Sequence, residues 1–101
     1  KIYRNFEKPV TYSIIKHGLL GITKYYAAKY GKYNITCNAI SPVGIFNDQN
    51  KKFVNRLKKL IPMNRMANKE DIKYSVNFLL SEKQKFITGH NLVIDGGRTI
   101  I

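Results

Sequence analysis

The chain has little cysteine, little acid and no tryptophan: its 101 residues include one Cys, six Asp or Glu and no Trp. The single cysteine, Cys37, cannot form a disulfide within the chain, which is typical of a reducing compartment such as the cytoplasm. Since it lies in an apolar, β-branched stretch, we interpret it as a small buried hydrophobe rather than a nucleophile. No apolar run approaches the ~20 residues of a membrane-spanning helix, so no membrane segment is expected.

The few acidic residues are outnumbered by 18 Lys and Arg, which gives a formal net charge of +12. That charge permits non-specific binding to polyanions, and a basic nucleic-acid-binding domain is one alternative. The basic residues are spread along the whole chain, however, and no zinc, helix-turn-helix or RNA-binding signature accompanies them. We therefore interpret most lysines as solvated and expect no specific nucleic-acid partner. His17 and His90 match no metal-ligand spacing, so no metal site is predicted.

A length of 101 residues allows at most one small domain, and the chain begins at Lys1 rather than at methionine. We therefore expect residues 1–101 to be a piece of a longer protein. Helical and strand-like segments alternate along the chain, which predicts an α/β fold with a parallel sheet and right-handed crossovers. About two strands and three or four helices are expected.

The helices are predicted from apolar spacing. Residues 10–30 form a long helix that Gly31 stops, and residues 49–60 form a short amphipathic helix with lysines outward. Asn68 begins a further helix, because it lies three residues before Asp71 in a variant of the capping box. The side chains expected to face inward are Val10, Ile14, Ile15, Leu19, Ile22, Tyr26, Ala27, Tyr30, Phe53, Val54, Leu57, Leu60, Ile72, Val76, Leu79 and Leu80.

The two strands are predicted from short apolar runs with clear stops. Residues 35–41 are mostly apolar and β-branched and end at Pro42, as expected for a buried strand of a parallel sheet. Residues 91–94 form the second strand, which the turn Asp95-Gly96-Gly97 closes. We expect these two strands to be neighbours.

The candidate reactive pair is Tyr12 and Lys16, at the start of the long helix. Residues four apart lie on one helix face, so the ammonium of Lys16 can sit beside the phenol. A nearby ammonium favours the phenolate and makes a tyrosine able to exchange a proton near neutral pH. Tyr25 and Lys29 repeat the spacing, but they lie too close to the following strand to leave room for the rest of a helix and a turn. We interpret that second pair as a packing aromatic and a solvated lysine.

Together with this pair, three downstream segments resemble the C-terminal part of a one-domain short-chain dehydrogenase/reductase. The segments are Asn38-Ala39-Ile40-Ser41-Pro42, Ile87-Thr88-Gly89 and Val93-Ile94-Asp95-Gly96-Gly97. The resemblance covers nearly the whole chain from about Pro9 onward. It implies the C-terminal portion of a Rossmann-like doubly wound parallel sheet. The family's glycine-rich dinucleotide-binding half, with its catalytic serine and supporting asparagine, is not among these residues.

The resemblance also implies roles for individual residues. Tyr12 would be the general acid/base of an NAD- or NADP-dependent interconversion of a carbonyl and an alcohol, and Lys16 its electrostatic and ribose-binding partner. The nicotinamide would be bordered by the backbone of Pro42, Val43, Gly44 and Ile45. The family usually has glycine directly after this proline, where the chain has Val43. A β-branched residue resists the conformations that glycine permits, and Gly44 restores some freedom one residue later.

Within the family, the chain is most similar to bacterial oxidoreductases of flagellin-modification and nonulosonic-sugar pathways, with 3-oxoacyl-carrier-protein reductases close behind. The substrate would be a small carbonyl or alcohol, sugar-derived or bound to an acyl carrier. The intact protein would be a homotetramer or homodimer, with the Asn68 helix and the last strand at one interface. The basic face of the segment from Phe46 to Ile61 could attract an anionic substrate, but we favour solvated lysines as its explanation. The alternative function is a non-catalytic truncated remnant or an oligomerisation partner of an intact subunit.

Two features indicate that this piece does not act alone. Gly18 and Gly21 lie inside the long helix, where each lowers helix stability by up to about 1 kcal/mol relative to alanine. Close approach of another backbone would compensate for this loss of stability. The sheet is expected to have an open edge and the long helix an uncovered apolar face. We therefore expect the 101 residues alone to be inactive.

Overall fold

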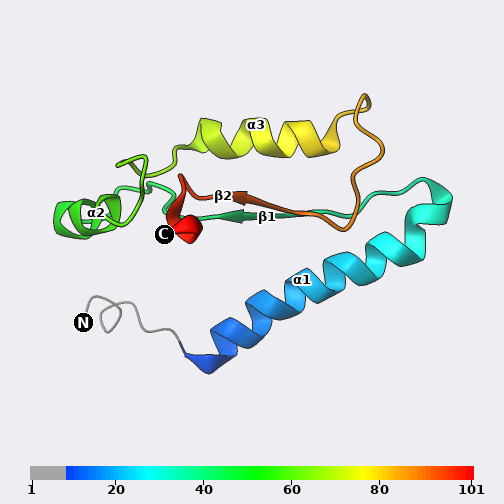
Figure 1. Cartoon of the computed structure of the whole chain (residues 1–101), viewed down its shortest axis with the longest axis horizontal. Coiled ribbons are helices and arrows are strands. Elements are labelled where there is room, and N and C mark those ends of the chain that lie inside the picture. The colour runs from blue at the N-terminus through cyan, green and yellow to red at the C-terminus, as the bar shows by residue number, and fades with distance from the viewer. Residues whose placement is uncertain (1–8) are drawn as a thin grey trace.

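The computed structural model describes residues 9–101. These residues form an α/β arrangement, as predicted, and residues 9–101 contain three α-helices and two strands. The elements in chain order are α1 (Val10–Tyr30), a 3-10 turn (Gly31–Tyr33), β1 (Ala39–Pro42), α2 (Lys51–Lys58), α3 (Lys69–Leu80), β2 (Asn91–Ile94) and a final 3-10 turn (Arg98–Ile100). The two strands lie between α3 and α1, and α2 lies beyond the carboxyl ends of both strands (Figure 1).

The strands pair in parallel, with Ala39 opposite Asn91 and Pro42 opposite Ile94. The predicted neighbourhood of the two strands is thus confirmed, and β2 has the predicted bounds. The prediction for the first strand was wrong at its start, because β1 begins at Ala39 rather than at residue 35. The residues just before it have only part of a strand ladder: the Gly89 N–H donates to the Cys37 carbonyl at 2.7 Å, whereas the Cys37 N–H donates to the side-chain Thr88 Oγ1 at 3.0 Å.

The long helix ends differently from the prediction. Gly31 has a helical φ of −56° and does not stop the chain, which continues as the 3-10 turn. The left-handed residue is Asn34, with φ 62°, whose N–H donates to the Gly31 carbonyl at 2.9 Å. Asparagine tolerates this region better than other side chains do, so it replaces glycine as the terminating residue.

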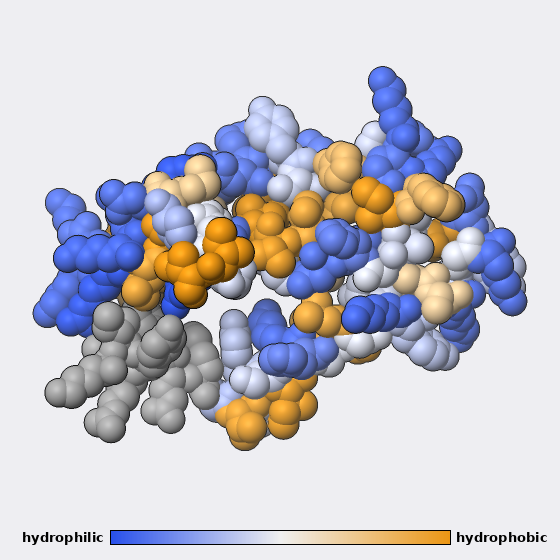
Figure 2. All heavy atoms as spheres, viewed as in Figure 1, coloured by the Kyte–Doolittle hydropathy of each residue, from blue (hydrophilic) through white to orange (hydrophobic). Residues whose placement is uncertain are grey.

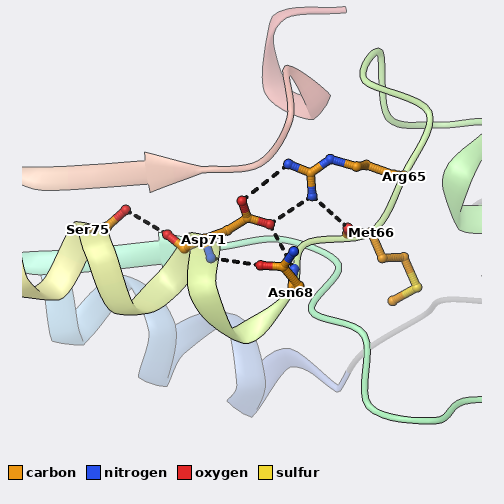
Figure 3. A network of polar contacts seen from close by, with 5 residues as sticks. All are labelled: Arg65, Met66, Asn68, Asp71 and Ser75. Carbon is orange, nitrogen blue, oxygen red and sulfur yellow. Dashed lines mark hydrogen bonds and ion pairs between the residues drawn. The ribbon is translucent and has the colours of Figure 1, made fainter.

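A polar network at the start of α3 confirms the capping box (Figure 3). Asn68 Oδ1 accepts from the Asp71 N–H at 2.9 Å, and Asp71 Oδ2 accepts from the Asn68 N–H at 2.8 Å. Arg65 adds a bidentate ion pair to the Asp71 carboxylate, at 2.8 and 3.2 Å. These bonds hold the connection from α2 to α3 in a defined conformation.

The core of the described residues is small. Its buried apolar side chains are Ala27, Ile61, Met66 and Leu79, together with the hydroxyl-bearing Thr23. On α3 the predicted inward positions Ile72 and Val76 are half-buried, but Leu80 is 76% exposed, because it lies in the last helical position before the chain turns away. On α2, predicted to span residues 49–60, Phe53 is exposed rather than inward.

The apolar face predicted for α1 is largely uncovered. Val10, Ile14 and Ile15 are 73%, 64% and 62% exposed, and only Thr23 and Ala27 of the helix are buried. No atom lies within 4 Å of the Cβ positions that Gly18 and Gly21 would carry, so nothing within residues 9–101 makes the predicted backbone approach. In that same range, no helix is both long and apolar enough to span a membrane.

Candidate active site

Tyr12 and Lys16 occupy the first two turns of α1. The helix begins after Pro9, whose extended backbone places its carbonyl to accept from the Tyr12 N–H at 2.9 Å. Proline suits this position because the first helical N–H groups have no helical partner. The Lys16 Nζ lies 5.5 Å from the centre of the Tyr12 ring, within the range of a cation–π contact. The predicted proximity of ammonium and phenol is therefore present.

The geometry of the pair does not by itself identify a site. Lys29 Nζ lies 5.7 Å from the Tyr25 ring, so the second Tyr–Lys pair has nearly the same arrangement. Tyr25 is 61% exposed and Tyr12 44%. What distinguishes Tyr12 and Lys16 is the surface they share with other elements.

A hollow of about 640 Å³ lies between α1 and β1, and Figure 2 shows the opening between the two layers. Tyr12 and Lys16 line it from the helix, and Ser41 and Pro42 line it from the end of β1. The full lining is Tyr12, Lys16, His17, Leu19, Leu20, Ile22, Thr23, Cys37, Ala39, Ile40, Ser41 and Pro42. The structure therefore brings Tyr12, Lys16 and Pro42 to one place, while Val43, Gly44 and Ile45 follow outside this lining.

The segment after Pro42 runs from the sheet toward α2. The Val43 N–H donates to the Ile94 carbonyl at 3.0 Å, which extends the strand pairing by one residue. Gly44 has a φ of 68°, and its carbonyl accepts from the Ala67 N–H at 2.8 Å. Ile45 forms a parallel bridge with Ala67. The left-handed backbone that a glycine permits thus occurs one residue after Val43.

Gly44 also has little room for a side chain. A Cβ built there would lie 3.1 Å from Ile61 Cδ1 and 3.3 Å from Leu57 Cδ2. Leu57 lies on α2 and Ile61 just after it, so the backbone at Gly44 is the surface on which this helix rests. The loop after β1 and α2 are therefore positioned together.

Sequence reasoning missed the side chains that align the two strands. Asn38 Nδ2 donates to the Ile87 carbonyl at 3.0 Å, and Asn38 Oδ1 accepts from the His90 N–H at 3.0 Å. Ser41 Oγ donates to Asn91 Oδ1 at 2.7 Å. Polar residues just before and within an apolar strand were the available signal, but their partners lie about 50 residues away in the chain.

The turn after β2 is stabilised by its own carboxylate. Asp95 accepts hydrogen bonds from the Gly97 N–H and from the N–H and hydroxyl of Thr99, at 2.7–2.9 Å. The Thr99 hydroxyl first, and then the backbone N–H of Gly97, lower the pKa of Asp95 below its ordinary value. His17 is held differently, with Nδ1 2.8 Å from the Ser13 carbonyl. Among residues 9–101 no cluster of His, Cys, Asp and Glu could hold a metal ion.

Comparison with known proteins decides the family. Residues 2–99 match the family model described as enoyl-(acyl carrier protein) reductase. A short-chain dehydrogenase from Leptospira borgpetersenii, solved with bound NAD+, superposes with a TM-score of 0.85 at 40% identity, over 92% of this chain and 37% of the other. The chain belongs to the short-chain dehydrogenase/reductase family. The resemblance inferred from the motifs is confirmed, and so is the Rossmann-like fold class.

Curated members of the family match over similar lengths. An NAD-dependent glycerol dehydrogenase from Listeria innocua is 38% identical over 93% of this chain and 39% of its own length. A 3-oxoacyl-[acyl-carrier-protein] reductase from Aggregatibacter actinomycetemcomitans is 34% identical over 87% of this chain and 37% of its own length. A further solved relative, with NADP bound, superposes with a TM-score of 0.82 at 29% identity, over 91% of this chain and 40% of the other. The chain spans about two fifths of the length of these short-chain dehydrogenase/reductase relatives.

Proposed function

We propose that residues 1–101 form the C-terminal part of an NAD- or NADP-dependent oxidoreductase that interconverts a carbonyl and an alcohol. The observation that carries the proposal is the hollow shared by Tyr12, Lys16 and the carboxyl end of β1. In open α/β sheets, ligands bind at the carboxyl ends of the strands. Relatives described as an NAD-dependent glycerol dehydrogenase and a D-threitol dehydrogenase support the reaction class.

In this proposal the chain's own residues move the proton. Tyr12 donates its hydroxyl proton to the carbonyl oxygen as the alcohol forms, and accepts it in the reverse direction. The ammonium of Lys16, beside the ring, stabilises the tyrosinate that remains. The bound nicotinamide dinucleotide would supply the hydride that adds to the carbonyl carbon. Lys16 would also hydrogen-bond its ribose.

The residues present fit the nicotinamide end of such a cofactor. The hollow lies within the ~300–1,000 Å³ usual for small-molecule sites, and it combines an apolar lining with a few polar groups. Pro42, Val43, Gly44 and Ile45 would border the ring, and the positive φ of Gly44 turns the backbone at this point. The pyrophosphate would need a glycine-rich turn from outside these 101 residues.

The finer properties follow from the same proposal. The substrate is a small carbonyl or alcohol, sugar-derived or carrier-bound. The intact protein is a homotetramer or homodimer, which is supported by the exposed apolar side chains of Tyr74, Phe78 and Val93 on α3 and β2. It is a cytoplasmic protein, which is supported by the presence of a single cysteine. The alternative, a non-catalytic remnant, is favoured by one observation: Val43 stands where the family usually has glycine.

The test uses the complete gene product and follows oxidation of NADH and NADPH with a panel of carbonyl compounds. Tyr12→Phe should lower kcat by about 100- to 10,000-fold while cofactor still binds, because the general acid is removed. Tyr25→Phe is the matched control, since Tyr25 has the same lysine geometry but does not line the hollow. Equal activity of wild type and Tyr12→Phe would refute the assignment. A folded protein that binds neither cofactor would favour the non-catalytic alternative.

A further inference from the structure

The strongest charge concentration in the described chain is on and just after α2. Residues 51–59 contain five cations and no acid, whereas the whole chain has 18 Lys and Arg in 101 residues. This local density is about three times the average of the chain. The five cations are Lys51, Lys52, Arg56, Lys58 and Lys59.

The nearest acids do not cancel this charge. Asp48 lies in the loop before α2 and supplies one negative charge. Asp71 is already engaged by Arg65, in a bidentate ion pair outside the cluster. The apolar face of α2 is turned inward, with Val54 and Leu57 half-buried, so Lys51, Lys52 and Arg56 remain exposed.

The position of α2 places this charge near the proposed site, although no α2 residue is among those that line the hollow. The helix lies beyond the carboxyl ends of β1 and β2, at the same end of the molecule as the start of α1 (Figure 1). Hydrophilic side chains cover it there (Figure 2). Leu57 and Ile61 fix it against Gly44, two residues after the Pro42 that lines the hollow. A molecule entering from this end therefore meets a positive potential before it reaches Tyr12.

We propose that α2 forms a cationic wall of the substrate site and that the substrate carries a carboxylate or phosphate group. The inference rests on the proposed oxidoreductase function and names the substrate class for it. A helix of eight residues is only ~12 Å long, which suits a small anion better than a nucleic-acid strand. Charges lining a cleft raise the association rate of oppositely charged substrates, and salt weakens this effect.

The experiment compares charged and neutral carbonyl compounds that otherwise match. Acetoacetate is paired with methyl acetoacetate, and dihydroxyacetone phosphate with dihydroxyacetone, so the two pairs separate carboxylate from phosphate. The measured quantity is the ratio of kcat/KM within each pair, for the complete gene product at low and high salt. We expect the anion to be preferred in at least one pair, with a preference that falls as salt rises.

The variant removes three exposed charges, Lys51→Gln, Lys52→Gln and Arg56→Gln. It should lower the anion-to-neutral ratio by about tenfold. The matched control, Lys29→Gln with Lys32→Gln, removes exposed charges in the last turn of α1 and in the 3-10 turn after it, and should leave the ratio unchanged. A ratio that is the same in wild type and variant would overturn the proposal. So would a variant whose only defect is weaker NADH binding, because the cations would then serve the cofactor.

Binding separates this proposal from the oxidoreductase function. Calorimetric titration with acetoacetate and with dihydroxyacetone phosphate should show at least fivefold weaker binding to the α2 variant than to the control. If no carbonyl is reduced but this loss is seen, the anion site stands and the oxidoreductase function falls. If carbonyls are reduced but the α2 variant has the same anion-to-neutral ratio as wild type, the oxidoreductase function stands and the anion site falls. Binding of oligonucleotides more tightly than either anion, lost in the variant, would also refute the small-anion assignment.

Discussion

At the residue scale, the same local pattern occurs twice with different consequences. Tyr12/Lys16 and Tyr25/Lys29 share their spacing, and their ammonium-to-ring distances differ by only a few tenths of an ångström. Their spacing identifies both pairs equally well, and the sequence separates them only by the room that each leaves before the following strand. The difference arises from β1, whose carboxyl end faces the first pair across the hollow. Whether such a pair lies at the proposed site therefore depends on an element about thirty residues away in the chain.

Gly44 provides a prediction at the same scale. Its positive φ strains any L side chain, and a Cβ would crowd Leu57 and Ile61. We expect Gly44→Ala to lower the free energy of unfolding by roughly 1–2 kcal/mol, measured by urea denaturation of the complete gene product. The substitution should also raise KM, because the loop bordering the proposed nicotinamide site and α2 shift together.

Gly31→Ala is the control for that substitution. Gly31 has a helical φ of −56° and open space at its Cβ position. Alanine there should be neutral or stabilising by up to about 1 kcal/mol, since it restricts the unfolded chain. Equal destabilisation by the two substitutions would show that the conformation of Gly44 is not the cause.

At the element scale, the start of α3 depends on one carboxylate. The hydrogen-bonded Arg65 guanidinium first, and then the Asn68 N–H, lower the pKa of Asp71 from 3.8 to about 2. A carboxylate with a depressed pKa stabilises the folded state above its ordinary pKa and loses that contribution as pH falls toward the folded value. We expect the stabilisation to be complete above pH ~4 and to disappear as the pH approaches ~2.

The measurement is the thermal midpoint of the complete gene product as a function of pH, compared with Asp71→Asn. The variant should melt at a lower temperature than wild type at pH 7, and the difference should shrink as pH falls through this window. Glu70→Gln removes the adjacent carboxylate outside the Arg65 network and should leave the midpoint nearly unchanged. A gap between wild type and Asp71→Asn that does not depend on pH would contradict this account.

The elements also show which parts of the fold local sequence can predict. The Asn68 capping box and the strand at residues 91–94 have their signals within a few residues, and both were predicted correctly. The start of β1 was not, because it depends on Asn38 and Thr88 contacts between segments about 50 residues apart. In the candidate site, the Tyr12–Lys16 pair was predictable from spacing. The hollow was not, because it exists only once α1 and β1 are placed.

At the scale of the whole molecule, the described chain leaves an apolar helix face open to water. Val10, Ile14, Ile15 and Ile22 on α1 are all more than half exposed. Contiguous apolar surface of this kind marks an interface, and the chain spans only about two fifths of its relatives' length. We infer that the rest of the complete protein covers this face.

This inference predicts opposite effects of one substitution in two contexts. Ile14→Lys with Ile15→Lys should make the isolated 101-residue chain more soluble and reduce its binding of a hydrophobic dye, because water-exposed apolar surface is removed. In the complete gene product the same change should lower stability by about 2 kcal/mol or more, since charges would be buried without partners. Lys substitution at Ile100 and Ile101, which are exposed at the other end of the chain, is the control. If the α1 substitutions have no effect on the complete protein, α1 remains exposed there, and the missing partner of this face must be sought in another subunit.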